Sequence, residues 1–241
     1  MTLKHLANAV FHTLRICVPT VIQGAIGGLT VETCDKRLDS WSRAILDYAK
    51  VELSVVGREL APENEAFVVM SNHQSLYDIP VLFQALQRRV RMVAKSELFR
   101  VPIWAGAMRN AGFVELDRKN RVAAMRSLER AKKAIADGTS IWIAPEGTRS
   151  PTGALGEFKK GGFHLAIGTG ARILPVSIDG TRRVLTAKGR VVHDHQRVTA
   201  TIHAPIATVD YGEKERPALI EAVRTAIGSA LSPPSQAPED D

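Results

Sequence analysis

The apolar residues of this chain fall into short continuous runs, and most of these runs are separated by segments with helical spacing. A short apolar run bounded by turn residues is typical of a strand buried on both faces, whereas apolar residues at three- and four-residue spacing predict an amphipathic helix. The runs predict strands at residues 51–56, 66–70, 90–94, 112–116, 140–144 and 173–179, with a hairpin over 191–206. The helical spacing predicts helices that begin near residue 75 and that cover residues 98–110, 120–136, 161–170 and 215–231.

This alternation predicts an α/β fold: a mixed, largely parallel sheet flanked by helices. A chain of 241 residues can bury one sizeable core, so we expect one main domain at residues 51–231. Residues 232–241 are Pro-rich and acidic, which is typical of a disordered tail.

The N-terminal segment, residues 1–50, predicts two helices. Residues 16–31 carry no charge, but this run is shorter than the roughly 20 apolar residues that span a bilayer, and Pro19 and several glycines interrupt it. We interpret the first helix as lying in a membrane interface; the alternative is a helix packed on the protein's own core. The second helix has an apolar stripe that fits lipid and core equally well: Leu38, Trp41, Ile45 and Tyr48.

The overall charge narrows the possible partners. Lys and Arg number 32 against 25 for Asp and Glu, a formal charge of +7, which favours a nucleic acid, a membrane surface or a phosphorylated substrate. The chain has few Trp and Tyr residues and no zinc-finger or RNA-recognition motif, so nucleic-acid binding has little support. Cys17 and Cys34 form no paired motif, which predicts free thiols, and the N-terminus lacks a signal peptide, so we expect the main domain to face the cytosol.

His73 follows the buried run at residues 66–70, where catalytic groups of α/β sheets lie. Asp78 comes five residues later, about 140° around a continuous helix, so the two side chains need a turn between them to meet. Ser75 is a candidate N-cap, which predicts that the chain reverses after His73 and enters a helix whose first turn carries Asp78. Asp78 would then bind one imidazole nitrogen and leave the other free as a general base. The alternative is that Ser75 and Asp78 only cap the helix and that His73 is an ordinary loop residue.

Two other predicted strands also end in charged residues. Glu146 and Arg149 follow residues 140–144, and Arg118 follows residues 112–116. A guanidinium group matches two phosphate oxygens, although each of these residues also fits a plain surface turn. We predict no metal site, because the residues 193–195 (His-Asp-His) lack further ligands nearby in the sequence.

Four segments, residues 72–78, 112–118, 145–150 and 174–176, resemble in order and rough spacing the four blocks of the glycerophospholipid acyltransferases, and in particular the bacterial 1-acylglycerol-3-phosphate acyltransferases. The resemblance covers about residues 51–206. Two residues depart from the family pattern: Ala144 stands where an aromatic residue is usual, and Glu115 where an apolar residue is common.

This resemblance implies the transfer of a fatty acyl group from acyl-CoA or acyl carrier protein to the sn-2 hydroxyl of lysophosphatidic acid, without a cofactor. His73 would be the general base and Asp78 would orient it. Arg149 and Arg118 would bind the acceptor phosphate, while Glu146 would meet the glycerol hydroxyls or order its loop. The full set of acceptor-binding residues that the resemblance implies is Arg118, Glu146, Gly147, Thr148 and Arg149. Because a thioester is already activated, the lack of a nucleophile motif agrees with this chemistry.

Other functions remain open. The acceptor could be another lyso-lipid, such as an ornithine lipid precursor. The chain could instead be a lipid or thioester hydrolase, which would need no phosphate-binding arginine, or a non-catalytic membrane-surface protein. For the enzyme, we expect a peripheral, monotopic location on the cytosolic face of the cell membrane, with residues 1–50 as the anchor.

Overall fold

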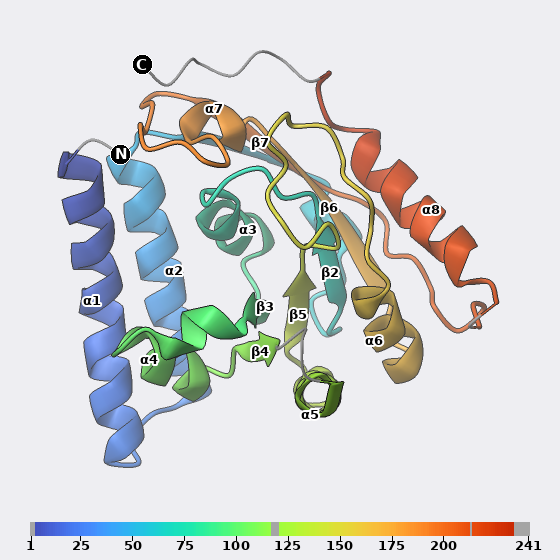
Figure 1. Cartoon of the computed structure of the whole chain (residues 1–241), viewed down its shortest axis with the longest axis horizontal. Coiled ribbons are helices and arrows are strands. Elements are labelled where there is room, and N and C mark those ends of the chain that lie inside the picture. Colours follow the sequence, from blue (N-terminus) through green and yellow to red (C-terminus); the bar gives the residue numbers. More distant parts are fainter. Residues whose placement is uncertain (1–2, 117–120, 213, 234–241) are drawn as a thin grey trace.

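The computed structural model describes residues 3–116, 121–212 and 214–233, and it is built around a seven-stranded sheet (Figure 1). The strand order across the sheet is β1-β7-β6-β2-β5-β3-β4. The strands are β1 (Glu52–Val56), β2 (Val68–Ser71), β3 (Val90–Lys95), β4 (Val114–Leu116), β5 (Ser140–Ile143), β6 (Ile173–Asp179) and β7 (Arg197–Ile202).

The sheet is mixed and mostly parallel, as predicted. Strands β2 to β6 run parallel to one another, whereas β7 pairs antiparallel with β6 and parallel with β1. The carboxyl ends of β2, β5 and β6 therefore meet at one edge of the sheet, which is where α/β proteins place their sites.

The predicted hairpin over residues 191–206 is wrong. Only its second arm forms a strand, β7, which pairs with β6 and β1 rather than with the preceding residues. The first arm contains the polar residues 193–195, and His195 has φ 60°, so the backbone there turns instead of extending.

Helices cover both faces of the sheet (Figure 1). They are α1 (Leu3–Ala25), α2 (Val31–Tyr48), α3 (Asp78–Leu86), α4 (Trp104–Asn110), α5 (Arg121–Ala136), α6 (Gly161–Thr169), α7 (Thr181–Val184) and α8 (Arg216–Gly228), with 3-10 helices η1 (Arg58–Leu60) and η2 (Ser96–Arg100). One core lies between the sheet and α2, α3 and α7, with Ile45, Leu82 and Val184 among its buried residues. The other contains Phe163 of α6 and Leu219 of α8.

Helix α1 continues through Pro19, which the sequence predicted would interrupt it. Proline removes one backbone donor, but its fixed φ is compatible with a helix. Contacts with α2 hold the helix on both sides of this position: Trp41 Nε1 donates to Thr13 Oγ1 at 3.1 Å, and the Arg37 guanidinium donates to Thr20 Oγ1 at 2.9 Å. None of the described helices is both long enough and apolar enough to cross a membrane.

Helix α2 packs its stripe on the core. Leu38 and Trp41 lie half-buried against the core and Ile45 is buried within it, whereas Tyr48 at the end of the helix is exposed. The sequence left open whether this stripe contacts lipid or the core. The structure shows that Leu38, Trp41 and Ile45 contact the core.

Candidate active site

The chain leaves β2 at Ser71 and makes a turn before α3 begins at Asp78. Buried Asn72 fixes the start of this turn to β6, because its amide group donates to the Ile178 carbonyl and accepts from the Ile178 N–H, both at 2.8 Å. His73 therefore lies at the carboxyl edge of the sheet, between β6 and β5.

The turn brings His73 and Asp78 together. His73 Nδ1 lies 2.7 Å from Asp78 Oδ2, and Asp78 is fully buried. Because a carboxylate only accepts, Nδ1 carries a hydrogen, and in the neutral imidazole Nε2 then has the free lone pair. The Asp78 carboxylate also accepts from the N–H groups of Gln74 at 2.7 Å and Ser75 at 2.9 Å. The Thr181 hydroxyl also donates to this carboxylate, so four donors fix its position.

Thr181 is a site residue that sequence reasoning missed. It is fully buried at the start of α7, and its hydroxyl donates to Asp78 Oδ1 at 2.5 Å. A polar residue two positions after the predicted strand at 173–179 was the available signal, since the other candidate residues also follow strands.

Ser75 is not the N-cap of α3. Tyr77 holds that position, and the Ser75 hydroxyl accepts from the Tyr77 N–H at 3.2 Å. The Asp78 side chain turns back to bind the N–H groups of Gln74 and Ser75, so it stabilises the turn that precedes the helix instead of capping the helix itself.

Trp142 of β5 supplies an apolar wall. Its ring is buried and lies edge-on to the His73 ring, with centroids 6.2 Å apart and an interplanar angle of 87°. Its indole N–H donates to Ser71 Oγ at 2.9 Å, which fixes the ring at the end of β2. The imidazole is therefore held by a carboxylate on one side and by an aromatic ring on another.

Glu146 joins the loop after β5 to the His73 turn. One carboxylate oxygen accepts from the His73 N–H at 2.8 Å and the other from the Gly156 N–H at 2.7 Å. Burial raises the pKa of this carboxyl, while the two backbone N–H groups and the nearby His73 act in the opposite direction. The two roles expected for Glu146 were binding of the glycerol hydroxyls and ordering of its loop. The second fits the structure better, because both carboxylate oxygens already accept from backbone N–H groups.

The remaining acceptor candidates have different surroundings. Gly147 has φ 72°, which turns the loop, and Thr148 is exposed. Arg149 is half-buried and makes no hydrogen bond or ion pair with any residue that the structure describes. Its guanidinium is thus available to a ligand. Arg118 lies outside the described residues.

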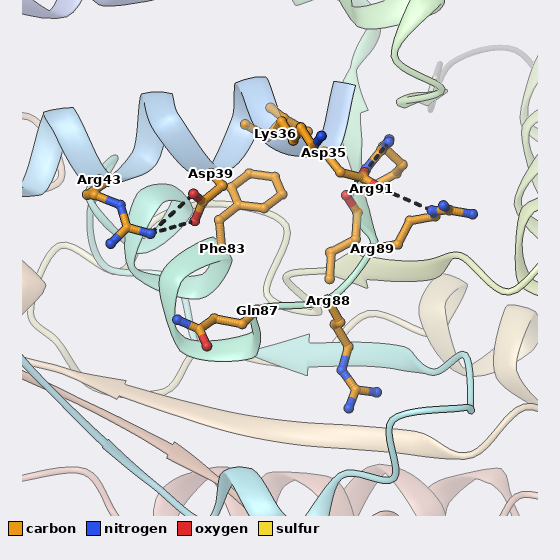
Figure 2. Close-up of a pocket in the computed structure, with 11 residues that line it drawn as sticks. Asp35, Lys36, Asp39, Arg43, Phe83, Gln87, Arg88, Arg89 and Arg91 are labelled. Atoms are coloured by element: carbon orange, nitrogen blue, oxygen red, sulfur yellow. Dashed lines mark hydrogen bonds and ion pairs between the residues drawn. The ribbon is translucent and has the colours of Figure 1, made fainter. Parts of the chain in front are cut away.

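A cavity of about 490 Å³ lies elsewhere, between α2, the end of α3 and the start of β3 (Figure 2). Five of its charged residues pair with one another: Arg43 with Asp39 at 3.2 Å, and Arg89 and Arg91 with Asp35 at 3.1 and 2.6 Å. It lies at the amino end of β3, whereas His73 lies at the opposite edge, so we interpret it as part of the attachment of α2 to the sheet.

No three His, Cys, Asp or Glu side chains among the described residues lie close enough to hold a metal ion. Asp194, which the sequence placed between two histidines, instead pairs with His5 of α1 at 2.7 Å.

Comparison with known proteins decides the family. Residues 52–179, from β1 to the end of β6, match the family model of the acyltransferases, and this range contains His73, Asp78 and Glu146. The chain belongs to the acyltransferase family. A 1-acyl-sn-glycerol-3-phosphate acyltransferase from chloroplasts of Arabidopsis thaliana is 34% identical over 160 residues, which is 66% of this chain and 45% of the relative. The alpha form from Mus musculus is 31% identical over 194 residues, 77% of this chain and 67% of the relative.

This chain spans about half the length of its plant and algal relatives, with 45%, 52% and 54% of them matched. A bacterial relative matches over nearly the whole length: the crystal structure of the 1-acyl-sn-glycerophosphate acyltransferase PlsC from Thermotoga maritima superimposes with a TM-score of 0.75 and 27% identity over 94% of both chains. The likeness therefore extends beyond the residues that match the family model.

Proposed function

We propose that this acyltransferase transfers a fatty acyl group from an acyl thioester to the free sn-2 hydroxyl of 1-acylglycerol 3-phosphate, which makes phosphatidic acid. The observation that carries the proposal is the 2.7 Å contact between His73 Nδ1 and a fully buried Asp78 at the carboxyl edge of the sheet. The relatives named above as 1-acylglycerol-3-phosphate acyltransferases support the choice of acceptor.

His73 acts as the general base. Its Nε2 takes the proton of the sn-2 hydroxyl as that oxygen attacks the thioester carbonyl, and Asp78 stabilises the imidazolium that forms. The carbon–sulfur bond then breaks, the ester carbonyl re-forms, and the departing thiolate takes the proton back from Nε2. No covalent acyl-enzyme is needed, because the thioester is already activated.

The cysteines support this direct transfer. Cys17 and Cys34 lie buried on α1 and α2, and burial raises the pKa of each thiol, so the thiolate that a nucleophile needs is disfavoured. The nearby serines are occupied: Ser71 and Ser75 both hold hydrogen bonds within the turn.

Arg149 binds the phosphate of the acceptor. Its guanidinium has no partner among the described residues, and it lies three residues after Glu146, which is bonded to the His73 backbone. Gly147 and Thr148 shape the loop between them, and Arg118 is expected to add a second guanidinium. Glu146 holds this loop against the His73 turn, so the acceptor phosphate and the general base keep a fixed separation.

Residues 1–50 form a monotopic membrane anchor on the cytosolic face, and residues 51–231 form the acyltransferase domain. Helix α1 exposes many large apolar side chains, and its only charged residues are the basic Lys4 and Arg15, which suit anionic headgroups. Those side chains are Leu3, Leu6, Val10, Phe11, Leu14, Val18 and Ile22. The predicted tail, residues 232–241, lies outside the described residues except for 232 and 233.

The test is an assay of the purified chain with labelled acyl-CoA or acyl carrier protein and lysophosphatidic acid in vesicles. We expect labelled phosphatidic acid, and a His73→Ala variant should lose nearly all of this product while keeping its circular dichroism spectrum. Free fatty acid as the main product would favour a hydrolase. Faster transfer to a lyso-ornithine lipid, which has no phosphate, would replace the proposed acceptor.

A further inference from the structure

The segment from Leu98 to Trp104, here called the 98–104 loop, covers the end of η2, the connection to α4 and the first residue of α4, and it exposes four large apolar side chains. Val101 and Ile103 are each 46% exposed, and Leu98 and Trp104 are also exposed. Buried Phe99 attaches the loop to the domain, and its carbonyl accepts from the Arg109 guanidinium at 2.9 Å. The loop is thus firmly attached, yet its apolar tip does not contribute to the core.

The tip of the loop is also strained. Ile103 has φ 66° and ψ −54°, and the Trp104 N–H donates to the Pro102 carbonyl at 2.7 Å, which together define a γ-turn of the rare form with positive φ. A β-branched residue rarely adopts positive φ, because its side chain collides with its own backbone. Such strain persists where function requires a particular display of side chains. Here the turn displays Ile103 toward the outside.

The loop leads directly into α4, and α4 packs against α1. Helix α4 crosses the C-terminal half of α1 closely: an added Cβ on Gly106 would lie 3.1 Å from a Val21 methyl, and Asn110 donates to the Thr20 carbonyl at 3.3 Å (Figure 1). The spacing that aligns Leu3, Leu6, Val10 and Leu14 on α1 continues at Cys17 and Val21. Cys17 is buried and Val21 half-buried, so α4 takes over the surface where the stripe of α1 would continue.

We propose that the 98–104 loop inserts into the lipid bilayer as a second membrane-binding element, beside α1. This inference rests on the proposed membrane anchor. A lipid surface is the occupant that fits, because the loop lies next in the fold to α1, and residues 3–31 contain no acid. The loop carries exposed Arg100; just before it in the chain lie exposed Lys95 and one exposed acid, Glu97. A tryptophan at the end of an inserted apolar loop suits the membrane interface.

The insertion has a consequence for the active site. The loop follows the carboxyl end of β3, and β3 runs parallel to β5 and β2, whose carboxyl edge carries His73. Two points of attachment, α1 and the 98–104 loop, fix the tilt of the domain, which a single helix cannot do. The sn-2 hydroxyl of a lipid then approaches His73 from one direction.

The first experiment compares vesicle binding of the full chain and a Val101→Asn/Ile103→Asn variant. Asparagine tolerates positive φ, so the γ-turn and the fold should be kept. On phosphatidylcholine–phosphatidylglycerol vesicles we expect the partition coefficient to fall by about tenfold, as two partly inserted apolar side chains are lost. The matched control is Leu60→Asn/Val209→Asn, which removes two exposed apolar side chains outside α1 and the loop and should change binding little. An unchanged partition coefficient in the loop variant would overturn the inference.

The second experiment uses Trp104 itself. Vesicles with brominated acyl chains should quench part of the tryptophan fluorescence of the full chain, and that part should disappear in Trp104→Phe, since Trp41 and Trp142 remain in both proteins. Equal quenching in the two proteins would contradict insertion of the loop.

A third variant separates this inference from the anchor on which it rests. The α1 surface variant, Leu6→Asn/Val10→Asn/Leu14→Asn, should lose vesicle binding whatever the loop does. If the α1 surface variant leaves the vesicles while the loop variant stays bound and Trp104 is not quenched, the anchor proposal holds and the loop proposal fails. If neither variant leaves the vesicles, both proposals fail. Sedimentation without lipid tests the other occupant. If the full chain forms a dimer that the loop substitutions abolish, the loop belongs to a protein interface instead.

Discussion

At the scale of single residues, the site depends on how completely the Asp78 carboxylate is held. It is fully buried and accepts from His73, Gln74, Ser75 and Thr181. An amide in its place cannot accept on both atoms, so Asp78→Asn leaves buried donors without partners and favours the wrong imidazole tautomer. We expect kcat to fall by about 10²- to 10⁴-fold.

The proposed role of Asp78 is to orient His73, so the apparent KM for the acceptor should change little in Asp78→Asn, and steady-state kinetics with varied lysophosphatidic acid checks this. A loss that appeared mainly in KM would instead assign Asp78 to acceptor binding. Thermal unfolding of the same variant should show a lower stability, by about 1–3 kcal/mol for the unsatisfied donors.

Thr181 is a positioning residue in this scheme, and its effect can be separated from packing. Thr181→Val keeps the shape and removes the hydroxyl, so we expect kcat to fall roughly tenfold, or about 1.4 kcal/mol. The acidic limb of the pH–rate profile should move to higher pH, since a carboxylate with one donor fewer attracts the imidazolium proton more strongly. Thr181→Ser, which keeps the donor, should restore both quantities. A fall in stability with an unchanged profile would reduce Thr181 to a packing residue.

Arg149 can be tested by a change that keeps its charge. Arg149→Lys loses the planar pair of donors that matches two phosphate oxygens, so acceptor binding should weaken by about 1.5–3 kcal/mol. The apparent KM for lysophosphatidic acid should rise accordingly, while that for the acyl donor stays the same. Equal acceptor constants in the two proteins would remove Arg149 from the phosphate site.

The part of the site that the sequence predicted is the part that is local in the chain. His73 and Asp78 are five residues apart, so a strand end followed by a turn is enough to pair them. Thr181 is 103 residues from Asp78, and Asn72 is 106 residues from Ile178, so these contacts exist only because β6 lies beside β2. Ser75 was placed wrongly as an N-cap because the capping rule does not include a carboxylate that turns back toward the preceding loop.

At the scale of elements, buried strands were predictable, while pairing and helix continuity were not. The strands predicted at 173–179 and 140–144 correspond to β6 and β5, because their apolar runs are bounded by turn residues. The hairpin was wrong because β7 finds its partners across the sheet, at β6 and β1. Pro19 did not end α1 because contacts with α2, absent from any local rule, hold the helix on both sides of it.

The loop after β5 gives a prediction at this scale. Glu146 holds the loop to the His73 turn, and Glu146→Gln can accept only one of the two backbone N–H groups that the carboxylate accepts. We expect a lower kcat and a more protease-sensitive loop. The matched control is Glu157→Gln, an exposed acid of the same loop whose one ion pair within the described residues is with Lys159, and it should change neither quantity. Equal kcat values in the two variants would contradict the tethering role.

The same carboxyl predicts a pH dependence of stability. Burial raises the folded-state pKa of Glu146 above its ordinary value of 4.5. Folding therefore favours the protonated carboxyl group of Glu146. The stability that this preference adds is fully present below pH 4.5 and is lost as the pH rises through the raised pKa. The free energy of unfolding of the native chain, relative to Glu146→Gln, should thus fall as the pH rises from about 4 to 7. Urea denaturation across that range measures it, and a rising difference would mean that the backbone hydrogen bonds outweigh burial.

At the scale of the whole molecule, the contacts of α1 decide which variant tests the proposed membrane anchor. Deletion of residues 1–31 would remove the proposed lipid contact, but Ala9 packs on the core between the sheet and α2, and Thr13 and Thr20 bind α2, so deletion would also expose interior surface. The α1 surface variant removes the exposed apolar side chains and leaves those contacts in place. It is therefore the cleaner test of whether a protein with this fold reaches its substrate by lying in the membrane surface.

We expect this variant to move from the membrane fraction to the soluble fraction, because each of the three lost side chains contributes part of the roughly 1.5–3 kcal/mol of a buried apolar group. Activity on a long-chain acceptor embedded in vesicles should fall at least about tenfold. Activity on a short-chain, water-soluble acceptor should stay near that of the native chain, since His73, Asp78 and Arg149 are untouched. A proportional loss on both acceptors would show that α1 supports the active site itself, and retention in the membrane fraction through high-salt and carbonate washes would show that another part of the chain holds the lipid.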